Sequence, residues 1–117
     1  MIFISTVKEA NRKKTMASSV QFLEYVMDQL SLLEDVSYKK MMGEYIIYYR
    51  GKIIGGIYDD RFLVKPTESA LLLMPEARME LPYEGTAKML LVDNTDDREF
   101  LCELFKAMYD ELPKPRK

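Results

Sequence analysis

Residues 40–52, KMMGEYIIYYRGK, decide the fold, because this stretch resembles both a phosphate-binding loop and a β-hairpin. A phosphate-binding loop of the Gly-x4-Gly-Lys-Ser/Thr type lies between a strand and a helix, so that backbone amides face the phosphates. Here Gly51-Lys52 is followed by Ile53-Ile54, which continues a strand-like apolar run. The spacing of Gly51, Gly55 and Gly56 also fails to match the dinucleotide-binding pattern Gly-x-Gly-x-x-Gly. The stretch is therefore predicted to be a hairpin without phosphate chemistry.

Around this hairpin the pattern predicts a four-stranded meander. Tyr, Ile and Val dominate, and Gly or Asp-Asp interrupts them at short intervals. Arg50-Gly51 and Asp59-Asp60 supply two of the turns, and Gly43 is expected to form a bulge or sharp bend between the first two strands. Short connections favour antiparallel neighbours. The strands are expected at residues 37–42, 44–50, 52–59 and 61–65.

A helix is expected before this meander. It is predicted at residues 18–33 with Ser18 or Ser19 as its cap, since apolar residues recur there at steps of three and four. These residues are Val20, Leu23, Met27, Leu30 and Leu33, with Val26 widening the stripe.

More elements are expected after the meander. A short helix at 68–73 and a strand at 88–92 precede a last helix capped by Asn94 or Thr95. The stripe of this last helix is Leu101, Leu104, Phe105, Met108, Tyr109 and Leu112. The predicted fold class is α+β, an antiparallel β-meander sheet flanked by N- and C-terminal helices.

Composition limits the function. The chain has 117 residues, 48% of them hydrophobic and 31% charged, which fits one domain. We expect residues 16–117 to form it and residues 1–15 to be an N-terminal extension that folding does not require. The net charge of -2 contrasts with the surplus of Lys and Arg in nucleic-acid-binding domains, so we expect no strong DNA binding by the chain alone. One cysteine and no membrane-spanning stretch lead us to expect a cytoplasmic protein.

The residue types offer little chemistry. Histidine is absent, which removes the usual general base near neutral pH and the Ser-His and Cys-His nucleophile pairs. Cys102 lies at the edge of an apolar helical stripe, where a small buried thiol is expected, and one cysteine is too few for a zinc site. A turn and a helix start explain Asp59-Asp60 and Asp96-Asp97 without a cation. We predict no catalytic residue, no cofactor and no metal.

The second strand is apolar on both faces. Alternation places Tyr45, Ile47 and Tyr49 on one face and Ile46, Tyr48 and Arg50 on the other. One face should meet the helices. The other needs cover from a partner, a second copy or the N-terminal extension. Aromatic residues beside lysines could also stack on nucleic-acid bases.

Six segments together resemble the N-terminal domain of the TfoX/Sxy family, the regulators of bacterial natural competence. In order they are Lys39-Lys40-Met41-Met42-Gly43-Glu44-Tyr45, Tyr49-Arg50-Gly51-Lys52, Asp59-Asp60-Arg61-Phe62-Leu63-Val64-Lys65-Pro66-Thr67, Pro82-Tyr83-Glu84-Gly85, Asp96-Asp97-Arg98-Glu99 and Glu111-Leu112-Pro113-Lys114-Pro115. Each is weak alone, whereas their order and spacing are fairly specific, and Met42 is a departure from the family pattern. The resemblance covers residues 18–117. It implies an α+β fold similar to YjbR-type domains, in a stand-alone member that lacks the helical C-terminal domain of full-length regulators.

The resemblance implies a regulatory role with a CRP-type transcription factor, and it brings no catalytic motif. We therefore expect a non-enzymatic regulatory or adaptor domain that acts through protein–protein contacts in transcriptional regulation, with a homodimer as a further expectation. Weak nucleic-acid binding is the alternative, and binding of a small ligand the third. The candidate partner-binding residues surround the junction of the first two strands: Lys39, Lys40, Glu44, Tyr45 and Lys65.

Overall fold

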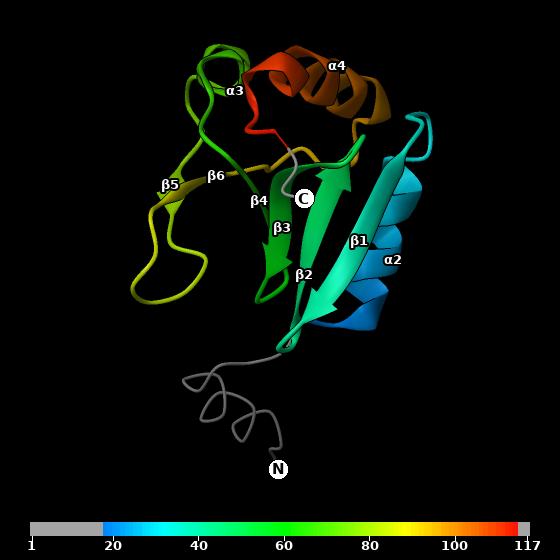
Figure 1. Cartoon of the computed structure of the whole chain (residues 1–117), viewed down its shortest axis with the longest axis vertical. Helices are drawn as coiled ribbons and strands as arrows, with labels where there is room; N and C mark the ends of the chain where they lie inside the picture. The colour runs from blue at the N-terminus through cyan, green and yellow to red at the C-terminus, as the bar shows by residue number, and fades with distance from the viewer. Residues whose placement is uncertain (1–17, 115–117) are drawn as a thin grey trace.

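The computed structural model describes residues 18–114, and the expectations for residues 1–17 and 115–117 lie outside them. The predicted meander is confirmed (Figure 1). It continues into a six-stranded sheet in which every neighbouring pair is antiparallel, in the order β1-β2-β3-β4-β6-β5. The strands are β1 Val36–Met41, β2 Glu44–Tyr49, β3 Lys52–Tyr58, β4 Arg61–Val64, β5 Met79–Glu80 and β6 Met89–Leu91. The sequence did not predict β5, which has only two residues.

All three hairpins of the meander use two-residue turns with positive φ at both central positions, as type I′ turns require. The turns are Met42-Gly43, Arg50-Gly51 and Asp59-Asp60. The expectation of a bulge or sharp bend at Gly43 is corrected: Gly43 is the second residue of a tight turn. The bulge lies in β3, where Ile47 pairs with Gly55 and Tyr48 with Ile53, so that Ile54 is left over.

Gly55 and Gly56 allow the strands around them to approach closely. A Cβ atom on Gly55 would lie 2.1 Å from the backbone oxygen of Leu63. A Cβ atom on Gly56 would lie 2.7 Å from both the backbone oxygen of Tyr45 and the ring of Tyr58. Any larger residue at either position would collide with these neighbours, so both glycines are required by the close approach of the strands.

Within residues 18–114, three α-helices accompany the sheet: α2 Val20–Gln29, α3 Glu68–Leu73 and α4 Arg98–Met108, the last continued by the 3₁₀ helix η1 Tyr109–Glu111. The Ser19 side chain caps α2 by accepting from the Phe22 N–H group at 3.1 Å. The cap expected at Asn94 or Thr95 is wrong, because the chain is still turning there and Asp97 accepts from Phe100 N–H at 3.0 Å.

The core lies between one face of the sheet and the helices. Helix α2 lies behind the sheet in Figure 1 and α4 crosses its upper end. The α-helix predicted at 18–33 is shorter, ending at Gln29, although Leu30 and Leu33 are buried in the turns that follow. Val20 is half exposed, whereas Val26 is fully buried, because the buried stripe is centred on Leu23, Val26 and Leu30. The stripe predicted for α4 is confirmed except at half-buried Tyr109.

Cys102 is half-buried against this core rather than fully buried. Among residues 18–114, no helix is both long and apolar enough to cross a membrane.

Candidate functional site

A groove opens on the face of the sheet that turns away from α2. It has a volume of about 490 Å³, and three strands and the C-terminal segment contribute to it. We call it the outer groove, and its lining residues are Lys39, Tyr48, Gly51, Ile53, Lys65, Pro113 and Lys114.

Strand register places the floor of the outer groove. Tyr48 points away from the helices because its neighbours Ile47 and Tyr49 point into the core, and Ile53, which pairs with Tyr48 across β2 and β3, points to the same side. Ile53 is 40% exposed. The floor is therefore apolar and accessible.

The C-terminal segment that forms one wall is held by contacts upstream of it. The Lys52 ammonium donates to the Tyr109 carbonyl at 3.0 Å and lies 4.1 Å from the centre of the Tyr109 ring. Leu112, which directly precedes the wall, is buried in the core.

The outer groove carries positive charge. Its lining includes three lysines and no carboxylate. Within the described part of the chain, ion pairs involve Arg61, Arg78 and Arg98, and none includes one of these lysines.

The structure brings together two of the five predicted site residues, Lys39 and Lys65. Lys40 pairs with Tyr45 across β1 and β2, so it lies on the helix side of the sheet. Tyr45 is only 4% exposed and packs edge-on against Tyr38, with ring centres 5.8 Å apart. The Tyr45 ring is part of the core. The expected grouping of all five side chains at one surface therefore does not form.

Glu44, the fifth residue, lies at the opposite end of β2 in a polar cluster. Its Oε1 accepts from the Ser18 hydroxyl at 2.8 Å and from the Asp59 N–H group at 3.2 Å. Ser18 Oγ in turn accepts from the Asp60 N–H group, and Ser18 N–H donates to the Gly43 carbonyl. These bonds join the start of α2 to two hairpin turns, so Glu44 stabilises the fold at this point.

Tyr58 lies near this cluster. Its ring packs over Gly56 and beside Tyr83, with ring centres 6.1 Å apart. Burial raises the pKa of the Tyr58 phenol above its ordinary value, and the nearby Tyr83 and Glu44 raise it further. The phenol therefore stays neutral well into alkaline solution.

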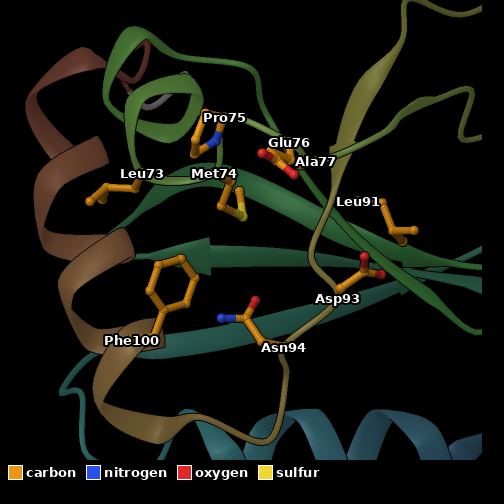
Figure 2. Close-up of a pocket in the computed structure, with 9 residues that line it drawn as sticks. All are labelled: Leu73, Met74, Pro75, Glu76, Ala77, Leu91, Asp93, Asn94 and Phe100. Carbon is orange, nitrogen blue, oxygen red and sulfur yellow. The ribbon is translucent and has the colours of Figure 1, made fainter.

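A smaller pocket of about 260 Å³ lies between α3 and the start of α4 (Figure 2). Leu73, Met74 and Phe100 give it apolar walls, and Asp93 and Glu76 add carboxylates. Nothing in the sequence indicated this pocket, because its walls come from separate segments. In residues 18–114 no group of three His, Cys, Asp or Glu side chains is arranged to hold a metal ion.

Besides the outer groove, the outer edge of β1 is accessible to a partner. β1 lies at the end of the sheet, and in the described residues only β2 pairs with it. Residues 37–41 are all exposed. The opposite edge strand, β5, has only two residues, and Glu80 on it pairs with Arg61 at 2.9 Å.

This small antiparallel α+β domain matches the family model of the TfoX N-terminal domain over residues 28–110. The match covers most of the chain, so the protein belongs to that family. It is also 29% identical over 102 residues to a protein of Spirochaeta aurantia named "Uncharacterized 12.7 kDa protein in trpE 5'region", an alignment that spans 86% of this chain and 89% of the relative. No solved structure matches the chain.

Proposed function

We propose that this TfoX-like domain is a non-enzymatic adaptor that acts in transcriptional regulation by adding a strand of a protein partner to the outer edge of β1, with which no strand of residues 18–114 pairs. The observation that carries the proposal is that six-residue edge, since an exposed edge presents backbone N–H and C=O groups to another chain. Family membership supports the regulatory role. A CRP-type transcription factor is the partner class that we test first.

The charge of β1 favours a different protein over a second copy. Lys39 and Lys40 lie on adjacent positions of this strand. In a dimer built by pairing two β1 strands, both lysines of each copy would lie along one seam, and like charges on paired strands are destabilising. A partner strand that carries carboxylates avoids this repulsion. We therefore propose a heterologous partner in place of the homodimer that the sequence suggested, and we expect the domain alone to be monomeric.

Site-specific photo-crosslinking tests the proposal. Tyr38 on β1 is 49% exposed and Tyr25 on α2 is 40% exposed, so the two tyrosines are a matched pair for replacement by benzoylphenylalanine. The chain carrying each replacement is irradiated in its native cells and with a purified CRP-type factor. We expect a protein adduct from position 38 and not from position 25. Adducts that form equally from both positions, or from neither, would contradict the proposal.

Weak nucleic-acid binding is the second candidate, because three lysines and the Tyr48 ring share the outer groove. Anisotropy titrations with duplex DNA at several salt concentrations test it. We expect no sequence preference and no binding tighter than about 10⁻⁶ M at physiological salt. A sequence-dependent affinity a hundredfold tighter would favour this candidate over the adaptor.

A further inference from the structure

We propose that the outer groove binds an extended acidic segment of a protein partner, in which apolar side chains alternate with carboxylates. The inference rests on the proposed adaptor function and adds the chemistry of what the adaptor recognises. Three properties of the groove support it: its positive charge, its apolar floor and its position beside the outer edge of β1.

The charge of the groove has no counterpart within the described residues. Lys39, Lys65 and Lys114 line one cavity without a carboxylate among the lining residues, in a chain whose net charge is -2. None of the three forms an ion pair with residues 18–114. Three like charges around one groove repel one another, and a ligand with carboxylates relieves that repulsion.

The floor of the groove favours the binding of apolar side chains. Tyr48, Ile53 and Pro113 provide carbon surface between the lysines. An isoleucine 40% exposed on a sheet face gains from cover by another apolar group. The volume of about 490 Å³ lies within the roughly 300–1,000 Å³ of ordinary ligand sites, which is enough for a few side chains.

The position of the groove beside β1 favours an extended peptide as its ligand. Lys39 belongs both to the groove and to β1, so a peptide paired with the edge of β1 has the groove beside it. Alternate side chains of an extended peptide point to opposite sides, so its apolar side chains can face the floor while its carboxylates stay within reach of the long lysine side chains around the floor. A polynucleotide fits less well, because its charge continues beyond the groove onto a protein of net negative charge.

The test uses peptides of seven residues and the ¹⁵N-labelled full chain. The probe has alternating Glu and Leu; one control has Lys in place of Glu, and another has Ser in place of Leu. We expect the Glu-Leu peptide to shift the amide signals of Lys39, Tyr48, Ile53 and Lys65, and both controls to bind at least about tenfold more weakly. Equal binding of the Lys-Leu control, or shifts confined to the pocket between α3 and α4, would overturn the proposal.

Variants of the lysines test whether the groove itself binds the probe. Lys39→Ala, Lys65→Ala and Lys114→Ala should each weaken binding about two- to fivefold, the size of an exposed ion pair, and the triple variant at least about tenfold. Lys88→Ala is the matched control, since Lys88 is exposed and lies outside the groove. Unchanged affinity in the triple variant would overturn the proposal, as would tighter binding of an eight-nucleotide oligo(dT) than of the Glu-Leu peptide.

The two proposals fail in different ways. A photo-adduct from position 38 that survives in the triple lysine variant would leave the adaptor function standing and overturn the groove as its recognition site. Binding of the Glu-Leu peptide in the groove, with no protein adduct from position 38, would contradict the adaptor function while the acidic-peptide site stands.

Discussion

The two faces of β2 differ in what covers them. On one face Tyr45, Ile47 and Tyr49 are buried under the helices. On the other face Ile46 and Tyr48 are only half-buried, and Tyr48 belongs to a groove that contains three lysines. Apolar character alone therefore did not decide burial in this strand. The helices cover one face, and the other combines accessible carbon with positive charge, which is the combination that a binding surface uses.

The largest expected effect comes from truncating one apolar side chain on each face. Ile47→Ala should lower the free energy of unfolding by about 2–5 kcal/mol, because it leaves a cavity in the core. Ile53→Ala, on the outer face, should lower it by about 1 kcal/mol or less, because the side chain is already partly in water. Urea unfolding followed by circular dichroism measures both. A loss at Ile53 as large as that at Ile47 would break the comparison, since it would mean that the outer face is also core.

The Glu44 cluster and the lysines of the outer groove provide the next comparison. Glu44→Ala should lower the free energy of unfolding by about 1–2 kcal/mol, because the Ser18 hydroxyl and the Asp59 amide lose their acceptor. Glu103→Ala is the control, because Glu103 is exposed on α4 and should change stability little. Equal effects of the two substitutions in urea unfolding would show that Glu44 does not stabilise the fold through these bonds.

The lysines of the groove should behave in the opposite way. Replacing Lys39, Lys65 and Lys114 together by alanine should change the free energy of unfolding by no more than about 0.5 kcal/mol per site, since they have no ion-pair partner in residues 18–114. The same variant should lose binding of the acidic peptide. Strong destabilisation in thermal and urea unfolding would show that these lysines hold the fold together, and the contrast with Glu44 would disappear.

The smallest effect concerns Glu111, next to the wall of the groove. Hydrogen bonds from the Ser69 hydroxyl, and then from the Ser69 N–H group at 3.0 Å, hold the pKa of Glu111 below its ordinary value of 4.5. A lowered pKa in the folded state means that this contribution to stability is present above about pH 4.5 and is lost as the pH falls through the lowered value. Ser69→Ala should move the pKa upward in an NMR titration of the Glu111 carboxyl. An unchanged pKa would show that the Ser69 hydroxyl does not bond to Glu111 in solution.

The sequence by itself determined the meander, because its signals are local. Gly and Asp at the turns supply positive φ, and the apolar runs between them are strand formers, so β1 to β4 end within about two residues of their predicted bounds. The alternation along β2 also predicted correctly that Tyr45 and Tyr48 lie on different faces. The sequence also predicted the family correctly, because the resemblance rests on the order and spacing of short motifs.

Only the tertiary structure decided which of those faces the helices cover and which residues meet on the other. Lys39, Ile53, Lys65 and Lys114 lie far apart in the sequence, and strand register together with the anchored C-terminal segment brings them to one groove. Tyr45 and Glu44 were expected at a binding surface. Instead, the Tyr45 ring is buried in the core, and the Glu44 carboxylate accepts a hydrogen bond from Ser18 at the start of α2. A residue's type fixes the interactions that it can make. Long-range packing chooses among them, and no local pattern encodes that choice.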